Sequence, residues 1–416
     1  MTVAVIAVGV GAVALSLYRL AHGNVERISL PALAEKTSSS EPLNVLVVGS
    51  DSREGLTAQE IESYRLGDFS GQRGDTVVLV SITPDREDVR VVSFPRDLVV
   101  VDGQHRRKLT ETFSEGPDHV VEVLTAATGI AIHHYVEVSI PGFLSVVDAV
   151  GGVDLCIDYP LRDEKSGADF DAGCHALSPP EALAFVRARN TPLGDFDRIE
   201  RQQEFMRALL DRLVATRTVV DVPRLFSVVE RVSRNVTTDS ALGVGEMKAL
   251  ARELRGLAEG QVPMLVVPTY TDVIDGKSYV VPYGPGAEAL YASLRHGVPT
   301  PSRGTQEDRA ATGVTVWSTG RPAAADLVGR TLHWAAFGLK GSVEGPLPRP
   351  PPRTVVYAAP GSTRRAAWVA ATLGATVQRP PIHVEFPEGA QVIVVVGADA
   401  PPPDDAGRPR RQETAT

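Results

Sequence analysis

The sequence has few cysteines, no excess of basic residues and no low-complexity stretch. Only Cys156 and Cys174 are cysteines, and they form no CxxC pair, so zinc and thiol redox sites are poorly supported. The 42 Lys and Arg residues face 51 Asp and Glu residues, a net charge of −9, which argues against nucleic acid as a partner. Gly and Pro make up about 16% of the chain, below the roughly 25–30% that signals low complexity. Wholesale disorder and a collagen-like chain are therefore excluded.

The length and hydrophobic content indicate a folded protein of several domains. At roughly 150 residues per domain, 416 residues predict two or three domains. Hydrophobic residues make up 43% of the chain, so a sizeable core can form without metal or disulfide staples. Because the net charge is negative, binding of an anion requires a local concentration of arginine and lysine.

The N-terminal segment carries no charge before Arg19 and is almost wholly apolar. This length is at the short end of a membrane span, and a basic n-region that would mark a cleaved signal peptide is absent. We therefore predict an uncleaved anchor helix over 1–20, with a buried core helix as the alternative. The predicted location is the cell membrane, crossed once, with the bulk of the chain outside the cytoplasm.

The two cysteines agree with that location. They stand eighteen residues apart, and no third thiol competes for either. Outside the cytoplasm a disulfide is permitted, and closing a loop of this size could add about 3 kcal/mol. Two unpaired core thiols are the alternative.

The remaining chain alternates short apolar runs with helical patterns, which predicts an α/β fold. We expect a polar linker over 21–42, an α-β-α sandwich with a central mixed sheet over 43–298, a second linker over 299–312, a small βαβαβ domain over 313–399 and a disordered tail over 400–416. Predicted strands lie at 44–48, 75–82, 89–94, 134–138, 153–157, 185–189 and 264–267. Predicted helices lie at 117–128, 141–150, 178–184 and 197–215, with further helix to about 258.

Basic residues gather near the predicted strand ends. Arg187 and Arg189 stand at strand spacing, which predicts that both project from one face. Arg198, Arg201 and Gln202 stand at helical spacing. Paired arginines are costly unless an anion or a carboxylate meets them, and a pyrophosphate could satisfy several of them. A salt-bridge network with Asp195 and Asp197, or solvated charges, is the alternative.

Two acidic residues stand at neighbouring strand ends. Asp51 follows one predicted strand and Asp75 opens the next. Two such carboxylates could hold Mg²⁺ and leave water and phosphate oxygens to complete the octahedron. Each residue alone is more often a turn residue or a helix cap.

Seven blocks of the sequence resemble LytR-CpsA-Psr proteins of the actinobacterial type, over about 44–213. The blocks occur in the family's order: GSDSR (49–53), RGDT (73–76), SFPRD (93–97), Lys108, VDAVGGVD (147–154), ALAFVRAR (182–189) and DFDRIERQQ (195–203). The segment 314–399 is similar to the LytR C-terminal domain, and Cys156 and Cys174 resemble a disulfide of actinobacterial relatives. One departure is Pro179-Pro180, where relatives carry a glycine-containing turn.

This resemblance implies a membrane-anchored phosphotransferase. Such proteins move a glycopolymer from a polyprenyl-pyrophosphate carrier to peptidoglycan. By motif, Asp51 and Asp75 would bind Mg²⁺ or Mn²⁺. The pyrophosphate would be held by Arg73, Arg96, Lys108, Arg187, Arg189, Arg198 and Gln202, with Asp195 orienting the arginines. A polyprenyl-pyrophosphate pyrophosphatase and a non-catalytic envelope or regulatory protein are the alternatives.

Overall fold

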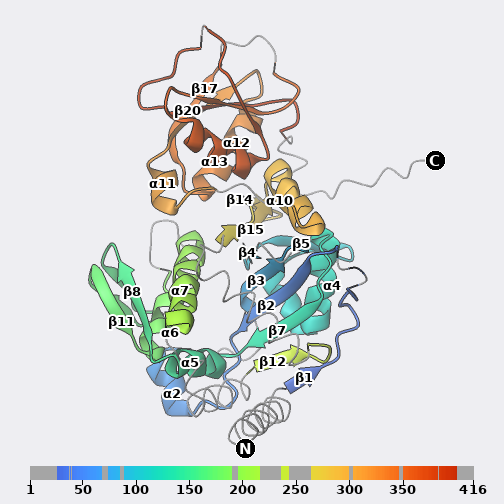
Figure 1. Cartoon of the computed structure of the whole chain (residues 1–416), viewed down its shortest axis with the longest axis vertical. Helices are drawn as coiled ribbons and strands as arrows, with labels where there is room; N and C mark the ends of the chain where they lie inside the picture. Colours follow the sequence, from blue (N-terminus) through green and yellow to red (C-terminus); the bar gives the residue numbers. More distant parts are fainter. Residues whose placement is uncertain are drawn as a thin grey trace, which may run out of the picture. The chain divides into compact units, whose positions relative to one another are not determined.

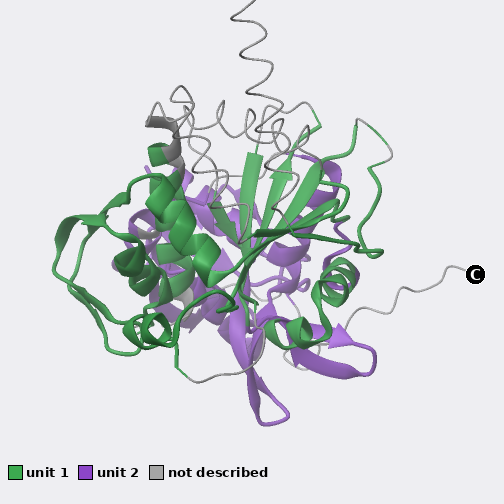
Figure 2. Ribbon diagram, turned by 90° about the horizontal axis from the view of Figure 1, so that it is seen from below, with its two compact units in different colours: residues 1–96, 110–125, 131–266 green, residues 97–109, 126–130, 267–416 purple. Residues whose placement is uncertain are grey.

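The described part of the chain forms two compact units, coloured separately in Figure 2. The first comprises Met1–Arg96, Thr110–Thr125 and Ala131–Val266, and the second Asp97–Leu109, Ala126–Ile130 and Val267–Thr416. This computed structural model describes residues 26–67 apart from 37 and 39, 74–84, 89–189, 195–215, 236–242, 264–298, 303–345, and 350–400 apart from 383. The predicted anchor at 1–20 and all of the predicted tail beyond Ala400 lie outside these ranges. Within these ranges, no helix is long and apolar enough to cross a membrane.

A seven-stranded mixed sheet is the centre of the first unit. Its order is β1 (Glu26–Ile28), β12 (Val236–Asp239), β7 (His134–Val138), β2 (Leu43–Ser50), β3 (Gly74–Ile82), β4 (Val89–Phe94) and β13 (Met264–Val266). The pair β2–β7 is parallel, whereas β2–β3 and β3–β4 are antiparallel. Apolar runs such as VRVVSF in β4 are buried along their whole length, as expected for central strands covered on both faces.

Helices cover both faces of this sheet. In Figure 1, α4 lies on one side of the sheet, and α5, α6 and α7 lie on the other. The helices of this part of the chain are α2 (Ala58–Ser63), α3 (Leu109–Thr112), α4 (Pro117–Thr128), α5 (Ile140–Ala149), α6 (Pro179–Arg187) and α7 (Asp195–Ala215), with a 3-10 turn at Phe113–Glu115. A mixed α/β fold with a central mixed sheet, as predicted, is therefore present.

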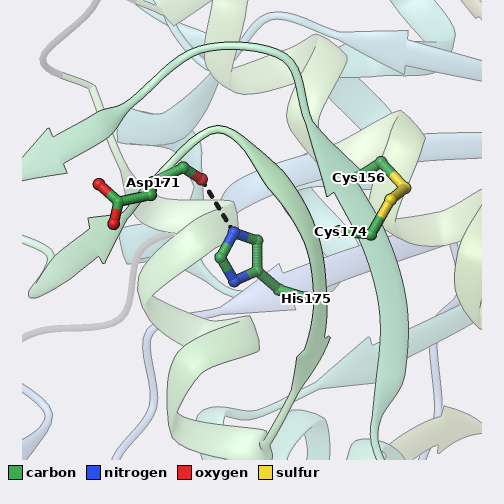
Figure 3. Close-up of a disulfide and its surroundings, with 4 residues drawn as sticks. All are labelled: Cys156, Asp171, Cys174 and His175. Atoms are coloured by element: carbon green, nitrogen blue, oxygen red, sulfur yellow. Dashed lines mark hydrogen bonds between the residues drawn. A yellow bond between two sulfur atoms is a disulfide. The ribbon is translucent and has the colours of Figure 1, made fainter.

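Two hairpins extend from the helical side and carry the disulfide. The first pairs β8 (Val153–Ile157) with β11 (Gly173–Leu177), and the second pairs β9 (Leu161–Asp163) with β10 (Ala168–Phe170). Cys156 and Cys174 are directly opposite each other in the first hairpin and are joined by a disulfide (Figure 3). In the same view, the Nε2 atom of His175 lies 2.8 Å from the carbonyl oxygen of Asp171. The predicted disulfide is confirmed.

The second unit contains a five-stranded sheet with a core of its own. The sheet order is β17 (Gly338–Glu344), β16 (Gly313–Ser318), β20 (Val392–Val395), β18 (Val355–Ala358) and β19 (Thr376–Gln378). Its helices are α10 (Gly284–His296), α11 (Gln306–Ala310), α12 (Pro322–Trp334) and α13 (Thr363–Leu373), and its hairpins are β5 (Val99–Asp102) with β6 (His105–Lys108) and β14 (Thr269–Ile274) with β15 (Lys277–Pro282).

Three sequence predictions differ from these elements. The stretch 185–189 is not a strand, because α6 continues to Arg187. Residues Val236–Asp239 form strand β12 inside the region predicted as helix up to about 258, most of which lies outside the described residues. Part of the predicted 21–42 linker forms β1, which pairs with β12.

Candidate functional site

The site is built at one end of strands β2 and β3, where the two predicted acidic residues meet. Ser50 pairs with Gly74, and Gly49 pairs with Thr76, so Asp75 is the extra residue of a β-bulge. Bulges of this kind redirect a side chain at the end of a strand pair. Asp51 directly follows Ser50, which places both acidic residues at the same end of neighbouring strands.

Gly74 is required here because the ring of Phe113 occupies the space of a side chain. A Cβ at position 74 would lie 2.2 Å from that ring. The glycine therefore lets β3 begin against Phe113, and the next residue, Asp75, is the bulged one.

Arginines surround the Asp75 carboxylate. A terminal nitrogen of Arg96 donates a hydrogen bond to Asp75 Oδ1 at 2.9 Å, and a terminal nitrogen of Arg189 lies 4.0 Å from the same oxygen. Burial opposes ionisation of Asp75, but the charge and hydrogen bond of Arg96, with the charges of Arg198 and Arg189, lower its pKa below the ordinary value. Asp75 is therefore ionised at neutral pH.

Arg187 lies at the border of this cluster, and its position corrects the sequence prediction. It ends helix α6, so it does not share a strand face with Arg189, which follows the helix in a loop. Its terminal nitrogens donate to the carbonyl oxygens of Tyr64 and Arg65 at 2.8 and 3.0 Å. Burial lowers the pKa of Arg187 while Asp75 raises it, and the neighbouring charge of Arg189 lowers it further.

Helix α6 forms because of residues at its start. Ser178 and Glu181 make a capping box, and the proline pair occupies the first helical positions, where proline is tolerated. The departure from the family pattern at Pro179-Pro180 therefore begins the helix that carries Arg187.

Helix α7 supplies two further predicted residues. Arg198 is 3% exposed and lies close enough to Asp75 to stabilise its charge. The side-chain amide of Gln202 donates to the carbonyl oxygen of Val186 at 3.3 Å. Asp195 is the first residue of α7, and its side chain is outside the described part.

The remaining predicted residues are not placed with this cluster. Arg73 lies outside the described residues. Lys108 belongs to the second unit, where its ammonium nitrogen is 3.5 Å from Asp97. The structure therefore assembles Asp75, Arg96, Arg187, Arg189 and Arg198, with Asp51 at the adjoining strand end.

Two neighbouring residues, Arg53 and Asp163, were missing from the predicted set, and Arg201 was noted only for its helical spacing with Arg198 and Gln202. Arg53 donates to the carbonyl oxygens of Gly67 and Leu66 at 2.6 and 2.7 Å, and its charge lowers the pKa of Arg187. Asp163 and Arg201 contact the backbone beside Arg189. Arg53 and Arg201 lie within the GSDSR and DFDRIERQQ blocks, which was the available signal, whereas Asp163 lies in no block.

The charge balance of the cluster favours a polyanionic ligand. Four guanidinium groups, those of Arg96, Arg187, Arg189 and Arg198, interact electrostatically with one carboxylate. Planar guanidinium groups match phosphate oxygens with paired hydrogen bonds. The fold and the site thus define an α/β protein with a cluster of arginines around a carboxylate at the end of two central strands.

Comparison with known proteins gives the family. The model of the LytR_cpsA_psr family matches residues 18–296, and the chain belongs to this family. It is 34% identical over 266 residues to "Probable cell wall biosynthesis protein LcpB" of Corynebacterium glutamicum, covering 63% of each chain. It is 28% identical to "Polyisoprenyl-teichoic acid–peptidoglycan teichoic acid transferase TagU" of Bacillus cereus, covering 57% of this chain and 77% of that protein.

A solved structure of similar fold is the "LytR-Csp2A-Psr enzyme from Actinomyces oris". The TM-score is 0.53 at 24% identity, and the match covers 65% of this chain and 96% of the other. This likeness supports the mixed α/β fold of the family domain.

Proposed function

We propose that this protein is an enzyme that transfers a glycopolymer from a polyprenyl-pyrophosphate carrier to peptidoglycan. The chain would be anchored in the cell membrane by residues 1–20, with the reaction outside the cytoplasm and segment 313–399 as a LytR C-terminal domain. The names of LcpB and TagU, which refer to cell wall biosynthesis and to teichoic acid transfer, support this class of reaction.

The observation that carries the proposal is the arginine cluster around Asp75. Arg96 and Arg189 reach the same carboxylate oxygen at 2.9 and 4.0 Å, and Arg198 acts on the same charge. A pyrophosphate brings several negative charges, which such a cluster can neutralise. Lys108, Gln202 and Arg73 would extend this set, with Asp195 orienting the arginines.

The two acidic residues fit a hard divalent cation. The Asp75 side chain is 42% exposed and ionised, and Asp51 follows the adjoining strand. Among the described residues, no third acidic or histidine side chain joins this pair in a cluster tight enough for an ion. Two carboxylates would leave most positions of Mg²⁺ to water and phosphate oxygens, and the bound ion would neutralise phosphate charge.

The chemistry follows from the charges. A peptidoglycan hydroxyl oxygen attacks the phosphorus next to the glycan and forms a new P–O bond. The bond from that phosphorus to the bridging oxygen breaks, polyprenyl phosphate leaves, and the hydroxyl proton is released to solvent. Arg96, Arg187 and Arg189 stabilise the negative charge that develops on the leaving phosphate, which is the main contribution to catalysis in phosphoryl transfer.

The test uses the full chain in detergent, with Mg²⁺, a labelled polyprenyl-pyrophosphate glycan and peptidoglycan fragments. We expect label to join the acceptor, and the rate to fall about 100-fold or more in Asp75→Asn and Arg189→Ala, the scale of losing one charge-stabilising group. Chelation of the divalent ion with EDTA should abolish transfer. Arg207→Ala, which removes an exposed arginine of α7, is the matched control and should retain the rate.

Two other outcomes would replace the proposal. Release of free glycan with no acceptor product, across several acceptors, would indicate a pyrophosphatase. Tight binding of the donor with no turnover would indicate a non-catalytic envelope protein.

A further inference from the structure

One peptide group beside the arginine cluster is held at both of its ends by buried charged side chains. This peptide joins Ala188 and Arg189. Its carbonyl oxygen accepts a hydrogen bond from the guanidinium of Arg201, and its N–H donates to Asp163 Oδ2 at 2.7 Å. Asp163 is 6% exposed and Arg201 is 3% exposed. Burying charges is costly unless they are well bonded, so this arrangement needs an explanation.

The two side chains come from different parts of the first unit. Asp163 ends strand β9, and its other oxygen accepts from the N–H of Lys165 at 3.0 Å, which fixes the carboxylate at the turn of the β9–β10 hairpin. Arg201 lies in helix α7 and also donates to the hydroxyl of Tyr159 at 3.4 Å. Hydrogen bonds from the β9–β10 hairpin and from α7 therefore hold the chain from two sides directly after the end of α6.

The orientation of the Ala188–Arg189 peptide determines the direction of the Arg189 side chain. At Ala188 the backbone turns from helical to extended, with φ −57° and ψ 139°, and the next side chain is the guanidinium that lies 4.0 Å from Asp75. Rotation of this peptide would move the Cα–Cβ bond of Arg189, and its long side chain would multiply the displacement. A misplacement of about 1 Å can cost about 100-fold in rate.

We propose that Asp163 and Arg201 are positioning residues, which hold the Ala188–Arg189 peptide so that Arg189 is directed toward the Asp75 end of the sheet. This inference rests on the proposed function, in which Arg189 binds the pyrophosphate. Neither residue touches the reacting phosphate. Both act through Arg189.

The test is a double-mutant cycle with Arg189. Asp163→Asn leaves one acceptor oxygen for the backbone N–H groups of Arg189 and Lys165 and for Ser166, and Arg201→Lys exchanges a planar fork for a single charged group. In the full chain, each is expected to lower kcat about 10- to 100-fold while KM for the donor changes less than about 3-fold. In an Arg189→Ala background, each should lower kcat less than about 2-fold further, because residues that act through one group are not additive.

Matched controls lie on the same two elements. Asp169→Asn in β10 removes a carboxylate that is 79% exposed, and Arg207→Lys changes an exposed arginine of α7; both should leave kcat unchanged. Thermal unfolding identifies any variant that fails to fold. If Asp163→Asn does so, Arg201→Lys carries the test, since lysine keeps the buried positive charge but lacks the planar fork that bonds both the Ala188 carbonyl and the Tyr159 hydroxyl.

The same double-mutant cycle is repeated with the dissociation constant for inorganic pyrophosphate as the readout. If the wild-type protein binds pyrophosphate through Arg189 but transfers no glycan, the proposed function is refuted. In that case, non-additive effects of the variants on the dissociation constant would still support the positioning role. If the Asp163 and Arg201 variants lower kcat or affinity as strongly in the Arg189→Ala background as in the wild type, the positioning role is overturned, and the proposed function stays intact. Variants that fold and retain wild-type kcat would overturn the positioning role as well.

Discussion

Asp239 is a single buried carboxylate that joins several segments of the first unit. It is 1% exposed, and it accepts hydrogen bonds from the backbone N–H groups of Tyr135, Ala241 and Leu242 at 2.8–2.9 Å. The Nδ1 atom of His134 lies 3.2 Å from one of its oxygens. Burial opposes ionisation of Asp239, but the bond to His134 and the backbone N–H donors outweigh it and lower its pKa.

This lowered pKa predicts how stability depends on pH. A carboxyl group with a depressed pKa in the folded state stabilises the fold above its ordinary pKa of about 3.9, and this contribution is lost as pH falls through the folded value. Asp239→Asn should therefore reduce the free energy of unfolding by about 3 kcal/mol at pH 7, as for a broken buried pair, and by progressively less as pH falls below about 4. Urea unfolding at several pH values measures the difference.

The control for this prediction is Asp169→Asn, at a carboxylate that is 79% exposed. A surface change of this kind should alter stability by less than about 0.5 kcal/mol at every pH. A loss for Asp239→Asn that is constant from pH 7 to pH 3 would contradict the role assigned to the ionised carboxylate.

At the same scale, sequence motifs could predict the charged residues of the site but not those that act on the backbone. Asp75, Arg96, Arg189 and Arg198 stand in short blocks at strand and helix ends, and the structure brings them together. Asp163 binds a backbone N–H group 26 residues further along the chain, a contact that no residue spacing encodes. Arg201 matches the pattern of a solvated helix charge, yet the packing of the hairpin over α7 buries it.

At the scale of elements, α6 shows why short apolar runs mislead. Phe185 and Val186 are typical strand residues, and the alternation up to Arg189 favoured a strand. Buried positions 182, 185 and 186 fall on one helical face, and the Ser178–Glu181 capping box begins the helix before this run is reached. A run of five residues is too short to distinguish the period of a helix from that of a strand. The capping residues next to the run therefore decide which structure forms.

Two arginines of the site form hydrogen bonds to the backbone at the end of α2. Arg53 and Arg187 together donate to four successive carbonyl groups, Tyr64 to Gly67. Within this turn Arg65 has a left-handed backbone, with φ 51°, which is costly for a residue other than glycine. If pyrophosphate draws the Arg187 guanidinium away from the carbonyls of Tyr64 and Arg65, the turn loses part of its support.

This exchange predicts that pyrophosphate loosens the α2 region. Addition of inorganic pyrophosphate to the full chain should speed amide hydrogen exchange at residues 58–67 by several-fold, since local opening becomes easier when stabilising bonds are lost. Exchange in α10, which lies in the second unit, is the internal reference and should not change. Saturating pyrophosphate that leaves 58–67 unchanged, or protects it, would show that Arg187 keeps its carbonyl partners.

At the scale of the whole molecule, central strands and amphipathic helices were predictable, and the edge strands of the C-terminal sheet were not. The buried runs of β2, β3 and β4 carry their own apolar pattern. By contrast, β17 has the sequence GLKGSVE and is mostly exposed, and the three residues of β19 are all exposed. Their strand character comes from pairing with β16 and β18, which depends on the rest of the fold.

The hydrophobic core of the second unit includes residues that precede the predicted domain boundary at residue 313. Tyr270, Tyr279 and Val281 from the β14–β15 hairpin, and Tyr283 directly after it, belong to the same core as α12 and α13. A guanidinium of α12, that of Arg330, lies 5.2 Å from the centre of the Tyr270 ring. These contacts place residues 269–283 within the hydrophobic core that the C-terminal sheet and its helices share.

Helix α10 packs against α13, a helix of this core. A Cβ at Gly286 would lie 2.0 Å from the carbonyl oxygen of Thr372 in α13, so the two helices approach closely at a glycine. A fragment that starts at 313 therefore loses one wall of its own core.

We accordingly expect a fragment 267–400 to be more stable than a fragment 313–400. Each of the four side chains, three in the hairpin and Tyr283 directly after it, contributes about 1.5–3 kcal/mol through burial, and their sum is comparable with the total stability of a small domain, about 5–15 kcal/mol. The shorter fragment should bind the dye ANS and unfold without a cooperative transition, whereas the longer one should melt cooperatively. Thermal melts of both fragments measure this. Equal, cooperative melting of the two would show instead that the C-terminal sheet and its two helices are sufficient, and that the boundary lies at 313.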